Sequence, residues 1–249
     1  MNKILFSMLM ILIAVPAFAR PVFVFSAGFG SCFLNGQTSE VKASRFIDDM
    51  VDQVTHLTGQ SPVVVRTCYA LGSDEIYVTA PELDYSNESM TRADFHKVVK
   101  DAVRFAGDNA PVYVLGHSHG GWTAMDLVRK VAQLNYRNLV TIDPISVVNC
   151  GPLVFSGGVV SGDAPGCREA PADLTAFGTM IGQRAKHWTN WFQVEFPLLH
   201  SESISTANEN LERGYNANWT NIFGAHAVIE VDPEIWQQTA QYVVDDLQR

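Results

Sequence analysis

The chain has 249 residues, of which 17 are basic and 26 are acidic, so its formal net charge is −9 at pH 7. This acidic balance argues against nucleic acid and against anionic membrane surfaces as partners. The length suits one folded domain with a substantial hydrophobic core, which we expect to occupy residues 20–249.

Residues 1–19 have the pattern of a secretory signal peptide. Lys3 precedes an apolar run from Ile4 to Val15, and Pro16 then leads into the small-residue exit Ala17–Ala19. The apolar run is too short to span a bilayer comfortably, and no later stretch is long and apolar enough to be a transmembrane helix. We therefore predict cleavage after Ala19 and a secreted or periplasmic protein. An uncleaved anchor is the alternative.

Beyond this leader, apolar runs alternate with helical patterns, which predicts an α/β fold with a mostly parallel sheet and helices on both faces. The expected strands are Val22–Ser26, Pro62–Thr67, Val112–Leu115, Leu139–Ile142 and Trp188–Phe196. The expected helices are Arg45–Leu57, a helix that Thr91 caps and that runs to Phe105, Trp122–Leu134 and Pro233–Leu247. We expect a long polar loop from Gly72 to Met90 and a polar surface stretch from Ser201 to Thr220.

The regular pattern breaks between Ser146 and Lys186, directly after the Leu139–Ile142 strand. This segment contains Gly157-Gly158, Ser161-Gly162 and Pro165-Gly166, and also two cysteines. We predict an insertion over residues 146–186 that lies across the sheet as a cap or lid, with a helix from about Ala172 to Gln183.

Four cysteines follow the leader, and an even number of cysteines in an exported protein favours disulfides. They are Cys32, Cys68, Cys150 and Cys167. Three pairings are possible, and we favour Cys32–Cys68 and Cys150–Cys167 because each pair brackets a locally closed region. Four buried, reduced thiols are the alternative. None of the spacings matches a zinc site, and no metal or other cofactor is predicted.

The Val112–Leu115 strand runs into Gly116-His117-Ser118-His119-Gly120, and a helical pattern begins at once. This Gly-x-Ser-x-Gly motif is the sequence form of a nucleophile elbow, a strand-to-helix turn that presents a serine hydroxyl for attack on a carbonyl. Side chains at Gly116 and Gly120 would crowd the neighbouring strand and helix. Ser118 is therefore the candidate nucleophile of a hydrolase.

A serine hydroxyl is a poor nucleophile unless a base takes its proton, and the base needs a third group to orient it. Asp143 is the candidate for this third group, because it ends the strand after the elbow helix, at the edge where an α/β sheet gathers its site. The structural alternative is an aspartate that caps a turn before Pro144. Asp163 and Glu195 are the other candidate acids.

The candidate base is His226, in a run of small residues that we expect to be a loop before the last helix. His200 is the alternative base. His117 and His119 flank Ser118, and we expect their side chains to point elsewhere, to shape the pocket or pack on neighbouring loops. His117 and His119 alone do not make a metal site. The remaining histidines are His56 and His96, expected inside helices as surface or packing residues, and His187, before the late strand.

Acyl transfer also needs two backbone N–H donors aimed at the developing oxyanion. One is expected from His119, the residue after the nucleophile. The other is expected from Phe29 or Gly30, because the glycine-rich stretch after the first strand lets its backbone approach a substrate closely. A bridge at Cys32 would hold this loop in shape. An ordinary glycine turn is the structural alternative.

These motifs resemble the α/β-hydrolase superfamily, in its branch of exported lipases and esterases. The resemblance covers most of residues 20–249 as a pattern: a glycine loop after the first strand, the elbow at Gly116–Gly120, the acid Asp143 and the late histidine His226. It implies a serine hydrolase that cleaves small-molecule or lipid carboxylic esters through an acyl-enzyme, without a cofactor. The chain departs from the family in one respect. Here the candidate acid comes directly after the strand that succeeds the elbow helix, whereas in the family it more often comes after the next strand along the chain.

The same three residues would serve thioester, amide or peptide substrates, since the triad is shared and the pocket decides. A non-catalytic binding module on the same fold is a second alternative. The sequence does not indicate the acyl chain length or the oligomeric state.

Overall fold

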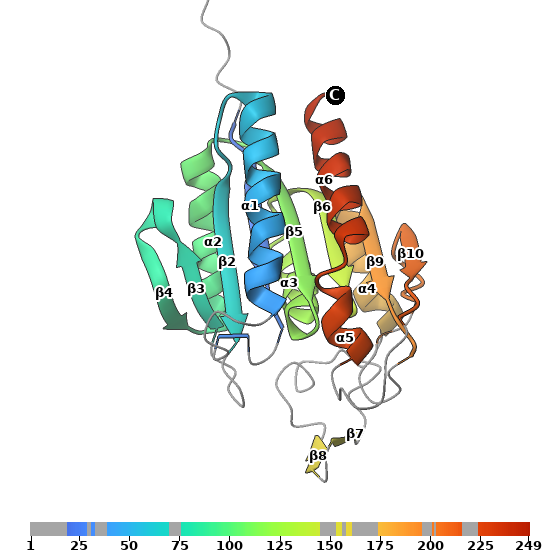
Figure 1. Ribbon diagram of the computed structural model, residues 1–249. Helices are drawn as coiled ribbons and strands as arrows, with labels where there is room; N and C mark the ends of the chain where they lie inside the picture. The colour runs from blue at the N-terminus through green and yellow to red at the C-terminus, as the bar shows by residue number, and fades with distance from the viewer. Residues whose placement is uncertain are drawn as a thin grey trace, which may run out of the picture.

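The computed structural model describes residues 19–28, 31–32, 39–69, 76–144, 153–155, 158–160, 174–195, 201, 203–215 and 224–249. Its centre is an eight-stranded sheet with the order β10-β9-β6-β5-β1-β2-β3-β4 (Figure 1). The strands are β1 Val22–Ser26, β2 Val63–Tyr69, β3 Ile76–Ala80, β4 Tyr85–Met90, β5 Pro111–His117, β6 Asn135–Ile142, β9 Trp188–Phe192 and β10 Glu209–Glu212. A separate antiparallel ribbon pairs β7 (Leu153–Phe155) with β8 (Gly158–Val160).

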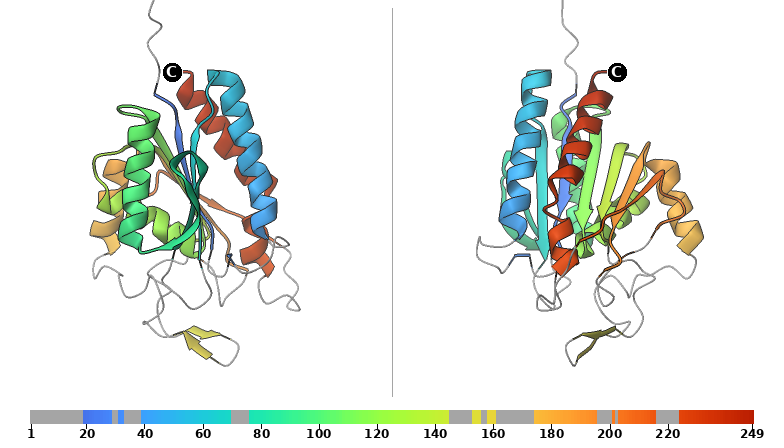
Figure 2. Two further views of the ribbon diagram at one scale, coloured as in Figure 1. Left: turned by 90° about the vertical axis from the view of Figure 1, so that its left-hand side faces the viewer. Right: turned by 45° about the vertical axis from the view of Figure 1, so that its right-hand side comes forward.

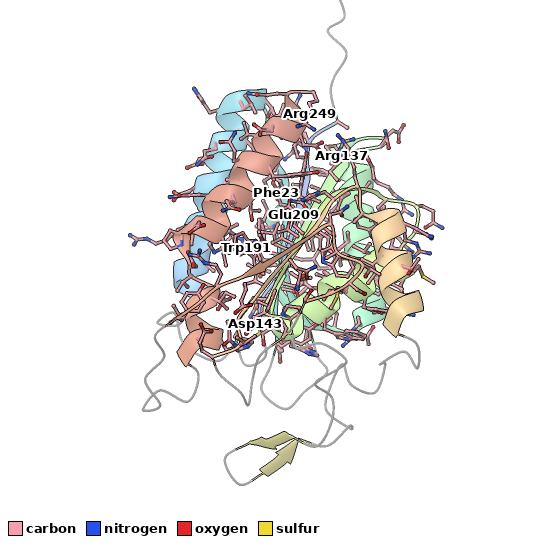
Figure 3. All side chains as sticks on the ribbon, turned by 90° about the vertical axis from the view of Figure 1, so that its right-hand side faces the viewer. Phe23, Arg137, Asp143, Trp191, Glu209 and Arg249 are labelled. Carbon is pink, nitrogen blue, oxygen red and sulfur yellow. A yellow bond between two sulfur atoms is a disulfide. The ribbon has the colours of Figure 1, made fainter. Side chains whose placement is uncertain are left out.

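Six neighbouring strands, from β10 to β2, run parallel, whereas β3 is antiparallel to β2 and to β4. Parallel strands place their carboxyl ends at one edge of the sheet, where an α/β protein gathers its site. Figure 3 shows this polarity along β6, with Arg137 toward one end of the strand and Asp143 just beyond the other.

Helices cover both faces of the sheet, as Figure 2 shows edge-on. One face carries α1 (Ser39–Thr58) and α6 (Pro233–Leu247), and the other carries α2 (Arg92–Ala106), α3 (His119–Lys130) and α4 (Leu174–Arg184). Two shorter helices complete the described elements, η1 (Pro81–Leu83) and α5 (Gly224–Ile229). The predicted architecture, a mostly parallel sheet with helices on both faces, is confirmed.

The strands bury both of their faces because each face lies under a helical layer. Successive side chains of a strand point to opposite faces, so β1 sends Val22 and Val24 into the core under α2 and α3, and Phe23 and Phe25 into the core under α1 and α6. Trp122 is almost fully buried at the start of α3. Two apolar layers therefore hold the central strands, and with them the turn after β5, in place.

Local signals explain several helix ends. The Thr91 hydroxyl caps α2 by accepting the backbone N–H of Asp94 at 3.2 Å, as the sequence predicts. Asp232 caps α6 in the same way by accepting the N–H of Glu234 at 2.9 Å, with Pro233 in the first turn.

No described helix has the length and apolar character needed to cross a membrane.

The structure corrects the sequence prediction in three places. The expected polar loop over 72–90 contains the β3 and β4 hairpin, which the prediction missed because β4 is an edge strand with mostly exposed side chains. The polar stretch after Ser201 contains the edge strand β10. His226 lies in the short helix α5 and not in a loop.

Within residues 146–186, the described parts are the β7–β8 ribbon and α4, which matches the helix expected near Ala172–Gln183. Cys150 and Cys167 lie outside the described residues. The predicted strand Trp188–Phe196 is too long, because β9 ends at Phe192 and the described residues 193–195 are not strand. The predicted Cys32–Cys68 disulfide is present, with a Cα–Cα distance of 5.2 Å. It ties the segment after β1 to the end of β2.

Candidate active site

Ser118 occupies the turn between β5 and α3 with φ 55° and ψ −125°. A positive φ is uncommon for a residue with a side chain, and it persists where the surrounding structure enforces it. The two motif glycines let neighbouring backbone pack against the turn closely enough to enforce this conformation. A Cβ added at Gly116 would overlap the backbone of Gly120, and one added at Gly120 would overlap the carbonyl of Ser26. The strand, sharp turn and helix of a nucleophile elbow are therefore all present.

Gly28, after β1, lies directly against this turn. A Cβ built on Gly28 would lie 3.0 Å from the Ser118 Cβ and 3.4 Å from its Oγ. The backbone after β1 thus passes beside the serine hydroxyl, where a second oxyanion donor is needed. Phe29 and Gly30, the residues expected to supply it, lie outside the described residues. His119, the other expected donor, is the first residue of α3, where the helix dipole favours negative charge.

Asp143 follows β6 and is fully buried. Its Oδ2 accepts the Nδ1–H of His226 at 2.6 Å and the Nε2–H of Gln193 at 2.8 Å, and its Oδ1 accepts the backbone N–H of Ser201 at 2.7 Å. Burial alone would raise the pKa of Asp143, but these hydrogen bonds hold the pKa below its ordinary value. The carboxylate therefore stays ionised at neutral pH.

His226 is 4% exposed. Burial is the largest influence on its pKa, which lies below that of an ordinary histidine even though Asp143 raises it. A hydrogen bond from Nδ1–H to the carboxylate leaves Nε2 as the basic nitrogen of a neutral ring. His226 is thus neutral at neutral pH, with one nitrogen able to take a proton.

No protein-family model and no curated protein matches the sequence. Solved structures do match. Two structures of Est1E from Butyrivibrio proteoclasticus, one with ferulic acid bound, align with TM-scores of 0.55 and 0.52 at 12% and 11% identity. Both alignments cover 94% of this chain, and they cover 92% and 91% of the Est1E chains. A soluble variant of monoglyceride lipase from Saccharomyces cerevisiae aligns at 11% identity over 92% of this chain and 87% of its own, with a TM-score of 0.49.

The chain has the α/β-hydrolase fold. In this fold Asp143, the candidate acid, follows β6, the strand directly beside β5. The early position of Asp143 in the sequence still leaves it within hydrogen-bonding distance of His226, because α5 brings the histidine back over the same edge of the sheet.

The two histidines beside Ser118 have different surroundings. His119 is buried and packs edge-on against Tyr69, with ring centroids 4.4 Å apart, and burial lowers its pKa to about 3. His117 packs beside His226, with ring centroids 4.8 Å apart. Its Nε2 lies 2.9 Å from the carbonyl oxygen of His226.

The alternative acids and bases have other positions. Glu195 is exposed, and its Oε1 accepts the backbone N–H of Tyr215 at 2.8 Å. Asp163 and His200 lie outside the described residues. His187 stacks on Tyr242 with ring centroids 4.8 Å apart. In the part of the chain that the structure describes, no group of three or more His, Cys, Asp or Glu side chains could hold a metal ion.

Sequence reasoning missed three residues around this candidate site: Gln193, Ser201 and Glu230. The strand-end rule could have found Gln193, because it follows β9, the parallel neighbour of β6. Ser201 contributes a backbone N–H, which carries no residue-type signal. The Nδ1 of His117 lies 3.4 Å from Oε2 of Glu230, and nothing in the local sequence pairs these two residues.

Proposed function

We propose that the protein is an exported serine hydrolase that cleaves carboxylic esters through an acyl-enzyme intermediate. The observation that carries this proposal is the 2.6 Å hydrogen bond between His226 and the buried Asp143, at the sheet edge that also carries Ser118. An aspartate that holds a histidine in one tautomer is the arrangement that activates a serine. The conformation of Ser118 at a strand-to-helix turn supports the same role.

In the first half-reaction, His226 Nε2 takes the proton of the Ser118 hydroxyl as Oγ attacks the ester carbonyl. Asp143 stabilises the imidazolium that forms. The tetrahedral intermediate then collapses, its bond to the alkoxy oxygen breaks, and His226 gives its proton to the leaving alcohol. The acyl group remains on Ser118 Oγ.

In the second half-reaction, water attacks the acyl carbonyl while His226 Nε2 takes its proton. Collapse of this second intermediate breaks the bond to Ser118 Oγ, which regains a proton from His226, and the carboxylic acid leaves. The N–H of His119 and a backbone N–H of the Gly28–Gly30 stretch stabilise the oxyanion in both halves. Every step uses side chains and backbone of this chain.

Two further observations support the proposed substrate class and the proposed export. Ferulic acid, a carboxylic acid, is bound to Est1E in one of the two aligned structures. The Cys32–Cys68 disulfide is typical of an oxidising compartment outside the cytosol, which fits export by the predicted signal peptide.

The test is a panel of p-nitrophenyl esters of increasing acyl length, compared with matched thioester and anilide analogues. We expect ester turnover by the wild-type enzyme and a loss of at least about 10³-fold in Ser118→Ala and His226→Ala, as for other triads. Faster turnover of thioester or anilide would assign the site to that acyl class instead. No turnover of any analogue, with correctly folded protein, would favour a binding module.

A further inference from the structure

A second histidine–carboxylate pair lies beside the first. His117 is the last residue of β5, directly before Ser118, and Glu230 directly follows α5. Their side chains are 9% and 7% exposed, and His117 Nδ1 lies 3.4 Å from Glu230 Oε2. A carboxylate at this distance from a buried histidine favours the protonated ring.

The second ring nitrogen of His117, Nε2, contacts His226, the residue that we expect to act as the base. The Nε2–H donates to the backbone carbonyl oxygen of His226 at 2.9 Å. The strand that ends directly before Ser118 is thereby linked to the main chain of His226, while Asp143 binds the His226 ring. A catalytic imidazole needs its position fixed to within a fraction of an ångström, and two independent hydrogen bonds on one residue provide this.

The charges around His117 come from several elements. Glu230 after α5, Asp143 after β6 and the backbone carbonyl of His226 favour its protonated form, and a positive His117 in turn lowers the pKa of His226. Arg66 of β2 lines the same cavity as His117, but its guanidinium is paired with Asp48 of α1. Burial, the largest single influence, would lower the pKa of His117, but Glu230, Asp143 and the carbonyl of His226 together outweigh it and raise the pKa.

We propose that His117 and Glu230 are positioning residues for His226, which hold its main chain and keep its ring neutral by placing a positive imidazolium beside it. This inference rests on the proposed function of His226 as the base. A cationic ring whose centroid is 4.8 Å from that of His226 opposes a second positive charge there, so the base keeps its lone pair at lower pH. Glu230 stabilises the cation and leaves the pair with no net charge.

A small cavity lies beside this pair. Its volume is about 50 Å³, and its lining includes His117 and Glu230 together with Ser44, Arg66 and Thr67. The space corresponds to about one or two water molecules.

The test follows the rate at which an alkyl fluorophosphonate modifies Ser118, measured from pH 4 to pH 9. The variant His117→Gln keeps an N–H near the position of Nε2 but removes the positive charge that lies between Glu230 and His226. On the acidic side of this pH–rate profile, the low-pH limb, the rate falls as His226 becomes protonated. We expect the midpoint of this limb to shift to higher pH by about one pH unit. In the double variant with Glu230→Gln the pair again has no net charge, and the limb should return toward its wild-type position.

The matched control is His96→Gln. His96 is buried to the same degree as His117, 8% exposed, but it lies on α2 beside Asp126, on the opposite face of the sheet. Burial lowers its pKa to about 4, so the substitution removes no charge near neutral pH. Its low-pH limb should coincide with that of the wild type.

An unmoved limb in His117→Gln, in an enzyme whose Ser118 is still modified, would overturn the positioning role and leave the proposed function intact. Absence of modification in the wild type would instead overturn the proposed function. Should His117→Gln fail to fold, ring ¹⁵N shifts of the wild type and Glu230→Gln carry the test. We expect a cationic His117 at pH 7 in the wild type and a neutral ring in Glu230→Gln; a neutral ring in the wild type would refute the inference.

Discussion

His226 Nδ1 and Asp143 Oδ2 lie 2.6 Å apart, although the two residues are separated by 83 positions in the sequence. The carboxylate also accepts hydrogen bonds from Gln193 and Ser201, so four segments of the chain meet at one buried group. Such convergence on a single carboxylate indicates that its geometry is fixed before any substrate binds.

Replacing the acid should abolish most of the activity without unfolding the protein. In Asp143→Asn the amide can donate to His226 Nδ1 and favours the wrong tautomer of the ring. We expect kcat to fall by about 10³–10⁴-fold with little change in KM. Steady-state kinetics on a p-nitrophenyl ester measure this. Gln193→Leu, which removes one donor to the same carboxylate, should cost far less, and equal losses in the two variants would argue against the assigned role.

A methyl group at Gly28 should slow acylation. The added Cβ would lie 3.0 Å from the Ser118 Cβ, closer than side chains normally pack, so either Ser118 or the backbone at Gly28 must shift. We expect Gly28→Ala to lower the acylation rate by about 10²-fold, as for other displacements of about 1 Å at a reacting centre. Stopped-flow acylation rates provide the measurement.

Gly59→Ala is the control for this variant. Gly59 follows α1 with φ +71° and has open space around its Cβ position, so alanine there costs backbone strain of about 1 kcal/mol and leaves the site untouched. A Gly28→Ala enzyme with wild-type acylation would show that the backbone after β1 does not border the reacting atoms.

The pH profile should reflect the lowered pKa of His226. The base must be neutral, so activity is present above the pKa of His226 and is lost as the pH falls through it. Because burial holds this pKa below the ordinary histidine value of about 6.5, the low-pH midpoint of kcat/KM should lie below 6.5 as well. A midpoint above 7 would contradict the environment described for His226.

The buried carboxylate of Asp246 should matter for stability and not for activity. It accepts hydrogen bonds from Tyr113 and Lys186 and a bidentate pair from Arg137, and these donors outweigh burial and lower its pKa to about 2. Its stabilising contribution is complete above the unfolded-state pKa of about 4 and is lost as the pH falls toward 2.

Asp246→Asn should therefore lower the free energy of unfolding at pH 7 by about 2–4 kcal/mol. Urea unfolding at pH 7 and pH 3 measures the effect, and the difference between variant and wild type should shrink at the lower pH. Activity per folded molecule should be unchanged, because Asp246 lies near the C-terminal end of α6, away from the elbow.

Loss of the Cys32–Cys68 disulfide should affect both stability and activity. The bridge joins residues 36 positions apart, which corresponds to about 4 kcal/mol of loop-closure entropy in the unfolded chain. It also holds Cys32, shortly after Gly28, at the end of β2. We expect Cys32→Ala/Cys68→Ala to unfold at lower urea and to acylate more slowly even where fully folded. An unchanged acylation rate would show that the disulfide does not influence the backbone beside Ser118.

The sequence was most informative where structure is locally encoded. The apolar run before Gly116 and the helical pattern after Gly120 predicted the elbow, and strand-end logic placed Asp143 at the correct edge of the sheet. The helix cap at Thr91 and the Cys32–Cys68 pairing were predicted as well. Each of these depends on a short motif or on a simple pairing of neighbours.

The features that sequence reasoning missed depend on tertiary contacts. The exposed edge strand β4 has no apolar periodicity, because solvent and not a core faces its side chains. The contact of His117 with the His226 carbonyl exists only once α5 packs over the end of β5. The backbone N–H of Ser201 on Asp143 is available to any residue type, so no pattern of side chains announces it.

The central claim is that Ser118 is a nucleophile activated by His226. The most direct measurement is intact-mass and peptide analysis of the folded protein after treatment with a serine-directed fluorophosphonate. The account predicts one adduct per chain, located on Ser118, absent in Ser118→Ala and strongly slowed in His226→Ala. An unmodified Ser118 in folded wild-type protein, or modification that proceeds equally well without His226, would contradict it.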